Sequence, residues 1–270
     1  MPATTSGLLL HLSGPLQAWG ERSRFNQRDT STAPTRSGLI GMIAAALGRR
    51  RDEPIDDLAE LRFTIRIDRP GTLLRDFHTV GGGMPRHLTV ITAEGKRRSA
   101  ETATLTSDRY YLADAAFTVL ATASDPALLE TCARALRRPH WPPYLGRRSC
   151  PPDAPLVLTE LTQDPVPVLI DLPLARKGGR RRTIPVEFRS DTPLTHHAWS
   201  ADSETASADQ VYTEIQDEPV SFSPEHRRYR TRPVYRTHLN LPVDQCAGYG
   251  IGYLNALLDH PAITESPAPA

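Results

Sequence analysis

The sequence contains a polar segment, residues 21–37, in which arginines outnumber acids and a helix is predicted to begin. Its cations and hydroxyls are Arg22, Arg24, Arg28, Thr35, Arg36 and Ser37, set against the acids Glu21 and Asp29. Free backbone N–H groups at a helix start, surrounded by hydroxyl and guanidinium groups, suit a phosphate-bearing partner. Because no reactive constellation lies beside them, the segment predicts a nucleic-acid binder and not a catalyst.

A second candidate segment is rigid and mixes aromatic residues with arginines. It reads His140-Trp-Pro-Pro-Tyr-Leu-Gly-Arg-Arg-Ser-Cys-Pro-Pro152. We expect Tyr144 to stack on a base while Arg147 and Arg148 hold phosphates. The alternative, in which Trp141 and Tyr144 pack into the core and the arginines are only solvated, stays open at this point.

Candidate catalytic and metal-binding residues are few. His78, in Asp76-Phe77-His78-Thr79, would suit a general base, but a lone histidine more often makes a structural hydrogen bond. His196-His197 has no third ligand at metal spacing, and Ser149-Cys150 has no histidine partner. The triple glycine 81–83 is not a dinucleotide fingerprint, and no P-loop pattern occurs. We therefore expect no metal, no cofactor and no catalytic residue.

Hydrophobic periodicity predicts the elements that position these groups. Strands are predicted at 8–12, 63–67, 73–80, 115–122 and 156–161, and helices at 36–47 and from 126 onward. Asp125 is the expected N-cap of the second helix, and Leu129, Cys132, Ala133 and Leu136 its buried face. Without residues 81–111, the order of elements resembles a ferredoxin-like or RNA-recognition-motif domain. We predict an α+β fold with such a domain at residues 1–162.

Residues 81–111 are predicted to be an inserted β-hairpin with a glycine hinge and a cationic tip; a mobile surface loop is the alternative. The second half, residues 163–264, is predicted to be mostly β. In it, strands at 166–172 and 183–188 flank the basic turn 176–182 as a second hairpin, and an alternating segment ends at Leu241. Whether this half is a separate domain or a second layer stays open, and 265–270 is expected to be a disordered tail.

The net charge of +1 conceals a strong segregation of charge. Residues 131–150 carry five arginines and no acid, whereas 201–218 carry six acids and no base. This pattern predicts a basic face and an acidic face. The three cysteines are odd in number and lack CxxC spacing, which favours a reducing cytoplasm without disulfides. No signal peptide or membrane span is recognisable, so we expect no membrane partner.

Five sequence blocks occur in a fixed order along the first part of the chain. They are Leu12-Ser-Gly-Pro-Leu-Gln-Ala-Trp-Gly20, Pro34-Thr-Arg-Ser-Gly-Leu-Ile-Gly41, Leu74-Arg-Asp-Phe-His-Thr-Val80, Tyr111-Leu-Ala-Asp-Ala-Ala-Phe-Thr-Val119 and Pro143-Tyr-Leu-Gly-Arg-Arg-Ser-Cys-Pro151. Together they resemble the type I-E members of the Cas5 family of CRISPR Cascade subunits. The resemblance is dense over residues 8–152 and loose beyond them. It implies a modified RNA-recognition-motif fold whose insertion is a β-hairpin thumb.

The resemblance also implies a non-catalytic RNA-binding subunit of the Cascade ribonucleoprotein in antiviral defence, one that binds and caps the 5′ handle of CRISPR RNA. The implied partners are CRISPR RNA, the large subunit CasA, the backbone subunit CasC and target DNA within the complex. The implied RNA-binding residues are Gln17, Arg24, Arg28, Arg36, Ser37, His78, Arg86, Arg109, Tyr144, Arg147 and Arg148. The alternative is a metal-independent endoribonuclease, with His78 or His87 beside Lys96, because relatives of another subtype cut the precursor RNA. This chain lacks a Lys-His pair at the insertion tip, which weakens that alternative.

Overall fold

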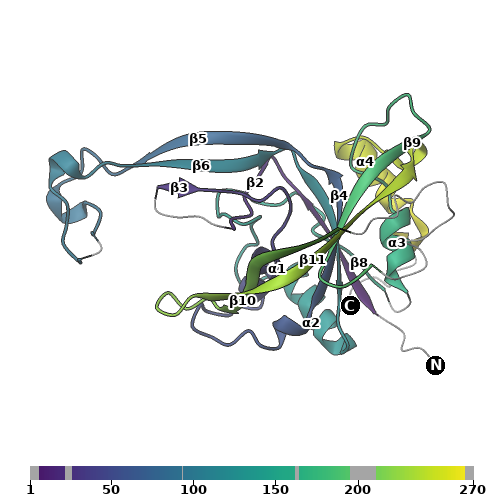
Figure 1. Cartoon of the computed structure of the whole chain (residues 1–270), viewed down its shortest axis with the longest axis horizontal. Helices are drawn as coiled ribbons and strands as arrows, with labels where there is room; N and C mark the ends of the chain where they lie inside the picture. The colour runs from purple at the N-terminus through teal and green to yellow at the C-terminus, as the bar shows by residue number, and fades with distance from the viewer. Residues whose placement is uncertain (1–5, 22–25, 93, 162–163, 195–210, 265–270) are drawn as a thin grey trace.

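In the computed structural model, two hydrophobic cores lie on opposite faces of one large antiparallel sheet. The structure describes residues 6–21, 26–92, 94–161, 164–194 and 211–264. Figure 1 shows the strands of the sheet. In this part of the chain the strands of the sheet follow the order β10-β11-β9-β4-β7-β1-β8. Their bounds are β1 (Gly7–Ser13), β4 (Arg62–Arg69), β7 (Ala116–Thr122), β8 (Val157–Leu161), β9 (Thr183–Ser190), β10 (Val211–Ser221) and β11 (Arg228–Pro242). The mixed helix and strand content agrees with the predicted class.

The first strand is buried on both faces, which explains its nearly continuous apolar run. Leu8, Leu10 and Leu12 point into the core that also contains residues of the helices α1 (Arg36–Ala46) and α2 (Pro126–Arg137). Leu9 points into the second core, with residues of the helices α3 (Pro165–Asp171) and α4 (Gly250–Leu258). Strand β1 is therefore central to both layers of the fold.

In the first half of the chain, the strands of the large sheet and the two α-helices occur in the order β1, α1, β4, β7, α2, β8. Helix α1 is Arg36–Ala46 and helix α2 is Pro126–Arg137. The four strands lie side by side as β8-β1-β7-β4, and each pair is antiparallel. The side chain of Asp125 accepts a hydrogen bond from the backbone N–H of Ala127, and the four predicted apolar residues of α2 are buried. The predicted cap and buried face of this helix are confirmed.

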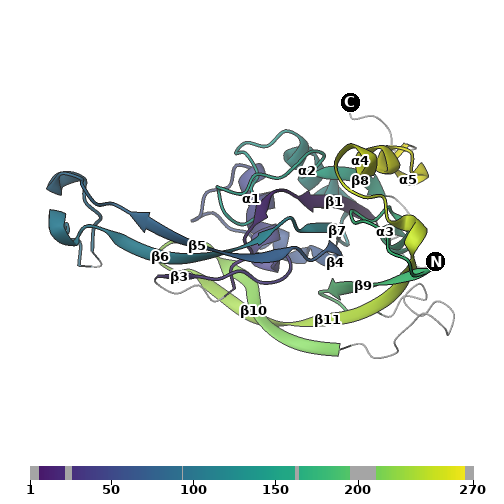
Figure 2. The same cartoon turned by 90° about the horizontal axis from the view of Figure 1, so that it is seen from above.

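A long two-stranded arm projects from this body (Figure 2). It consists of β5 (Thr72–Val80) and β6 (Leu105–Ala113), which pair in unbroken register from Thr72 opposite Ala113 to Val80 opposite Leu105. The short strand β2 (Leu16–Gln17) pairs with the base of β6, and β3 (Gln27–Arg28) pairs with its middle; together they complete a second sheet. The short helical turns η2 (Arg86–Leu88) and η3 (Ala100–Thr102) form the end of the arm.

The predicted boundaries of the insertion were too narrow. Residues 73–80 form a strand, as expected, but that strand belongs to the arm, and β4 pairs directly with β7. The error arose because Leu73, Leu74 and Phe77 resemble a buried strand, although all three are exposed on the arm. Apolar patterning alone does not distinguish a core strand from one that a partner covers.

The second half of the chain extends the same sheet, since β9 pairs with β4 and with β11. The alternating segment that ends near Leu241 is a strand, as predicted. The predicted strand at 166–172 is wrong: Pro165–Asp171 is helix α3, with Asp164 as its N-cap. A short apolar run is ambiguous between strand and helix, and the Asp-Pro start signal decides it here. Residues 176–182 therefore join a helix to a strand and do not form a hairpin turn.

The remaining elements are η1 (Leu58–Glu60), η5 (Val243–Gln245), α4 (Gly250–Leu258) and α5 (Pro261–Thr264). Helix α4 packs Tyr253 and Leu257 into the second core. Of the predicted acidic loop, residues 211–218 lie in strand β10. The rest of that loop, the His196-His197 pair and the predicted tail 265–270 lie outside the described residues.

Candidate nucleic-acid interface

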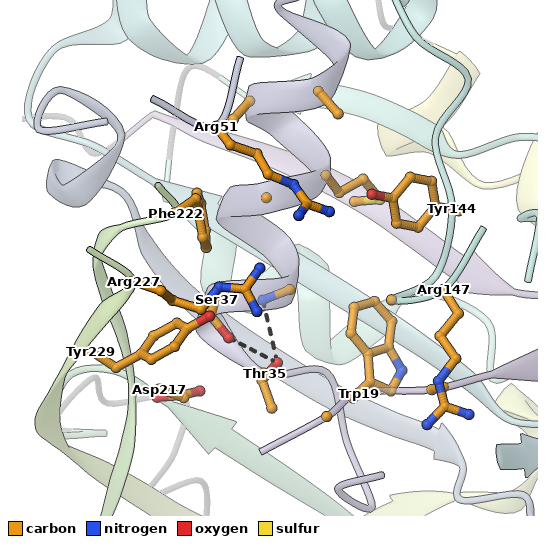
Figure 3. Close-up of a pocket in the computed structure, with 18 of the residues that line it drawn as sticks. Trp19, Thr35, Ser37, Arg51, Tyr144, Arg147, Asp217, Phe222, Arg227 and Tyr229 are labelled. Carbon is orange, nitrogen blue, oxygen red and sulfur yellow. Dashed lines mark hydrogen bonds between the residues drawn. The ribbon is translucent and has the colours of Figure 1, made fainter. Parts of the chain in front are cut away.

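A groove of about 750 Å³ lies over the first turns of α1, between the Tyr144 loop on one side and the turn between β10 and β11 on the other (Figure 3). In the described part of the chain, seven arginines line it, and we call it the arginine groove. They are Arg28, Arg49, Arg50, Arg51, Arg147, Arg148 and Arg227. Aromatic side chains from both sides join them, namely Trp19, Trp141, Tyr144, Phe222 and Tyr229.

The charge of the groove is strongly positive. Among the described lining residues the acids are Glu21 and Asp217. The Asp217 carboxylate is buried and accepts hydrogen bonds from the guanidinium of Arg232 and, at 2.7 Å, from the backbone N–H of Arg36. Burial lowers the pKa of Arg232, but the carboxylates of Asp191 and Asp217 outweigh this and raise it above the ordinary value. The groove therefore presents an excess of cations to an anionic ligand.

The floor of the groove is a face of α1 made of small residues. Gly38, Gly41, Ala44 and Ala45 all line it. A Cβ atom at position 38 would lie 2.7 Å from the indole ring of Trp19, so only glycine fits there without displacing the ring. Small side chains let a ligand approach the helix closely.

The start of α1 is less open than the sequence indicated. The Thr35 hydroxyl accepts a hydrogen bond from the backbone N–H of Gly38, and the Asp217 carboxylate accepts one from the backbone N–H of Arg36. Two donors that we expected to be free for phosphate are thus already used within the protein. The hydroxyl of Ser37 remains in the groove, 3.4 Å from that of Thr35 (Figure 3).

The structure does not support the expected role of the Arg36 side chain in phosphate binding. This side chain is only 2 % exposed. Its guanidinium donates to the carbonyl oxygens of Leu61 and Ala59, each at 2.7 Å, and binds the Asp191 carboxylate. Arg36 therefore ties α1 to the start of β4 and the end of β9.

Gln17 likewise has a structural role, and the structure does not support the expected RNA contact of its side chain. Its side chain is fully buried, and its amide NH₂ donates to the carbonyl oxygens of Leu12 and Ala115, at 3.1 and 2.9 Å. Its side-chain oxygen accepts a hydrogen bond from the Trp19 indole N–H at 3.0 Å. Gln17 thus positions the ring against which Gly38 packs.

The Tyr144 loop is held tightly against the groove. Gly146 has φ +83°, and a Cβ there would lie 1.7 Å from the carbonyl oxygen of Ala18, so this position requires glycine. The Arg147 guanidinium donates to the carbonyl oxygens of Tyr110 and Arg28, at 3.1 and 2.8 Å, and lies 4.7 Å above the ring of Tyr111.

The outward residues of this loop remain accessible to a ligand. Arg148 is exposed, and Tyr144 is half-buried at the wall of the groove. Trp141 is 39 % exposed, which rules out the alternative that it is a core residue. Arg147 mainly anchors the loop, whereas Arg148 and Tyr144 face the space a ligand would occupy.

Three of the predicted residues lie on the arm and not in the groove. His78, on β5, has its Nδ1 3.3 Å from an oxygen of Asp76. Arg109, on β6, pairs in register with Arg28, which does line the groove. Arg86 is exposed in η2 at the end of the arm. Arg24 lies outside the described residues.

No three His, Cys, Asp or Glu side chains in the described ranges are grouped so that they could hold a metal ion. The described helices include none that is both long and apolar enough to cross a membrane.

The model of the family described as CRISPR-associated protein (Cas_Cas5) matches residues 7–235, a range that contains every lining residue of the arginine groove. The chain belongs to the Cas5 family. It is 37 % identical over 180 residues to the CRISPR system Cascade subunit CasD of Escherichia coli (strain K12), an alignment that covers 62 % of this chain and 76 % of that protein.

Solved structures of Cas proteins are similar over almost the whole length. A chain of a CRISPR RNA-guided surveillance complex is 43 % identical, with a TM-score of 0.80, and the match covers 93 % of this chain and 98 % of that one. A structure described as a Cas protein is 30 % identical, with a TM-score of 0.57, over 90 % of this chain and 98 % of the other.

The Cas5 fold brings into the groove cations that the sequence analysis missed. Arg49, Arg50 and Arg51 follow directly after Gly48, where α1 has ended. Arg49 is bound by Asp57, and its hydrogen bonds hold the pKa of that carboxyl below its usual range. Arg50 and Arg51 are exposed and line the groove. Three consecutive arginines after a helix stop were a signal that we overlooked.

The other missed residues come from the turn between β10 and β11 and from the start of β11. Phe222, Arg227 and Tyr229 face the Tyr144 loop across α1 (Figure 3). No local pattern predicts this placement, because the turn follows α1 by about 180 residues and reaches it only through the pairing of β11 with β9.

Proposed function

We propose that this Cas5-family chain is a non-catalytic subunit of a type I-E Cascade ribonucleoprotein and that its arginine groove holds the 5′ handle of CRISPR RNA. The observation that carries the proposal is the groove itself, where arginines and aromatic rings from distant segments meet over α1. The relatives support the same class of ligand, because CasD is a Cascade subunit and the 43 % identical chain comes from an RNA-guided surveillance complex.

The proposed mechanism is recognition without bond cleavage. Arg50, Arg51, Arg148 and Arg227 are exposed and pair with phosphates, which sets the register of the RNA. The half-buried ring of Tyr144 offers a face on which an unstacked handle base packs. Guanidinium groups suit this task because they bind phosphate oxygens in a bidentate manner.

We infer further that residues 1–162 form a ferredoxin-like or RNA-recognition-motif domain and that 163–264 is a β-rich extension of it. The strand and helix order β1, α1, β4, β7, α2, β8, with the antiparallel arrangement β8-β1-β7-β4, supports this assignment. In this domain the arm is the thumb-like insertion.

The arm supports the proposal of protein partners, CasA and CasC, within an assembly that also engages target DNA. It exposes several large apolar side chains: Leu73, Leu74, Phe77, Val80, Met84, Leu88 and Ile91. An exposed apolar surface of this extent on a narrow ribbon indicates a region that a partner covers.

A cytoplasmic location is part of the proposal. All three cysteines lie in the described ranges and are free thiols. Burial raises the pKa of Cys132 to about 11 and also raises that of Cys150, which makes both thiols poor nucleophiles. Free, unreactive thiols are consistent with a reducing compartment.

Titration of a labelled RNA with the purified full-length chain tests RNA binding in the groove. We expect Arg51→Gln and Arg148→Gln each to weaken binding about tenfold and to flatten the log–log salt dependence by about 0.7 per lost phosphate contact. Arg134→Gln removes an exposed charge from α2, outside the groove, and is the matched control. Equal affinity of all variants at every salt concentration would refute the assignment.

The same preparation tests for cleavage. Incubation of labelled repeat RNA with the chain in EDTA is expected to leave the RNA intact. Specific cleavage that disappears in His78→Ala or His87→Ala would replace the proposed binding subunit with a metal-independent endoribonuclease.

A further inference from the structure

A second cationic surface lies outside the arginine groove, in the loop that joins α3 to β9. We call residues 176–182 the basic loop; they read Arg-Lys-Gly-Gly-Arg-Arg-Arg and contain no acid. Every residue from Lys177 to Arg182 is exposed. The loop lines no part of the groove, and the proposed handle binding does not use it.

The basic loop is fixed at both ends. The carbonyl oxygen of Arg176 accepts a hydrogen bond from the N–H of Gly248 at 3.0 Å, and that of Arg182 accepts one from the N–H of Val243 at 2.9 Å. Between these anchors, a Cβ at Gly179 would meet open space. The cations are therefore displayed on an anchored, projecting loop and not on a free chain end.

One further cation, Arg69, lies at the base of this loop, beside Tyr249. The guanidinium of Arg69 lies 4.4 Å above the Tyr249 ring, and the Nζ of Lys177 lies 5.4 Å from it. Arg69 also donates to the carbonyl oxygen of Ala175 at 2.7 Å and binds Asp114. Asp244 of η5 and Asp171 at the end of α3 are exposed acids of the neighbouring segments. Five cations of the loop and Arg69 thus outnumber the nearby carboxylates.

The basic loop and the arginine groove lie at opposite ends of β11. This strand begins beside Arg227, in the groove, and ends at Pro242, which pairs with Thr183 next to the loop. At roughly 3.3 Å per residue, its fifteen residues span about 45 Å. One short segment of RNA in the groove does not reach the loop.

We propose that the basic loop is a second nucleic-acid site, which binds the phosphate backbone of duplex DNA. Single-stranded nucleic acid is normally held by bases stacked on free aromatic rings. The aromatic ring here, Tyr249, is already engaged by two cations, so the loop offers charge without a stacking platform. Clustered arginines of this kind contact phosphates independently of sequence.

A triple substitution, Arg180→Gln, Arg181→Gln and Arg182→Gln, tests this site in the full-length chain. The side chains are exposed, so the fold should be unaffected. The probe is a short labelled DNA duplex of random sequence, titrated at several salt concentrations. We expect at least a tenfold loss of duplex affinity at low salt and a log–log salt slope flatter by about 2.7 units, from the loss of three phosphate contacts.

Two controls separate this inference from the proposed function. Arg134→Gln, Arg137→Gln and Arg138→Gln remove the same charge from exposed positions in and directly after α2 and should leave duplex affinity nearly unchanged. The basic-loop variant should bind handle RNA with the affinity of the parent. The groove variants should show reduced affinity for RNA and unchanged affinity for the DNA duplex. The basic-loop site would be overturned if the parent chain did not bind the duplex, or if the α2 control lost as much duplex affinity as the basic-loop variant. It would also be overturned if the basic-loop variant lost affinity for RNA and not for the duplex.

Discussion

Replacement of Arg36 by methionine is expected to destabilise the chain and leave its affinity for RNA intact. Methionine retains the apolar stem of the side chain but removes the charge that faces Asp191, whose side chain is 8 % exposed. The Asp191 carboxylate would keep Arg232, at 2.7 Å, and the backbone N–H of Phe63, at 2.9 Å. The charges of Arg36 and Arg232 nearly balance those of Asp191 and Asp217 in this buried network. Without the Arg36 guanidinium, the network would carry a net negative charge.

The expected cost follows from these contacts. Breaking a buried ion pair from one side costs about 3–5 kcal/mol, and the lower part of this range applies here because Asp191 keeps the guanidinium of Arg232. The carbonyl oxygens of Ala59 and Leu61 add little, since Arg62 also donates to both. We therefore expect a loss of about 3–4 kcal/mol in the free energy of unfolding and a Tm lower by about 10 °C.

Thermal and urea unfolding measure this effect, and the exposed groove variant Arg51→Met is the control, expected to unfold like the parent. RNA affinity is then measured below the unfolding transition, where Arg36→Met should bind within about threefold of the parent. An unchanged Tm together with a large loss of RNA affinity would mean that the Arg36 side chain contacts the ligand and that the structural role is incorrect.

Two further perturbations test the packing beneath the site. Gly146→Ala places a methyl group against the carbonyl oxygen of Ala18 at a positive φ, so we expect the free energy of unfolding, measured with urea, to fall by about 2 kcal/mol or more. Gly179→Ala, whose methyl group would meet open space, is the control. Equal stability of the two variants would contradict the requirement for glycine at position 146. Burial lowers the pKa of His11 from 6.5 to about 4, so the unfolded chain takes up this proton at higher pH than the folded chain. The stability contribution is complete above about pH 6.5 and is lost as the pH falls toward 4, by up to about 3 kcal/mol. His11→Gln should flatten this part of the stability curve, and an unchanged acid dependence would exclude His11 as its source.

Local patterns along the chain were sufficient to predict much of the fold. The apolar run of β1, the periodicity of α1 and the Asp125 cap of α2 each depend on neighbours in sequence, and all three predictions are confirmed. These three elements were therefore predictable from the sequence alone.

Side-chain roles within the candidate site depended on contacts that no local pattern contains. Arg36 looks like a phosphate ligand beside a helix start, but its partners Asp217 and Asp191 lie 181 and 155 residues away. Arg227 enters the groove through a strand turn from the other half of the chain. Conversely, the apolar face of β5 looks like core and is exposed on the arm.

The sequence by itself determined most of the helices and strands, and it determined that arginine dominates the basic surfaces, because capping, periodicity and composition act over a few residues. Only the tertiary structure decided which arginines are neutralised in the interior and which remain free to bind. The reason is physical: the charge that a guanidinium presents to a ligand depends on the carboxylates and carbonyl oxygens around it, and the folded chain draws those groups from distant strands.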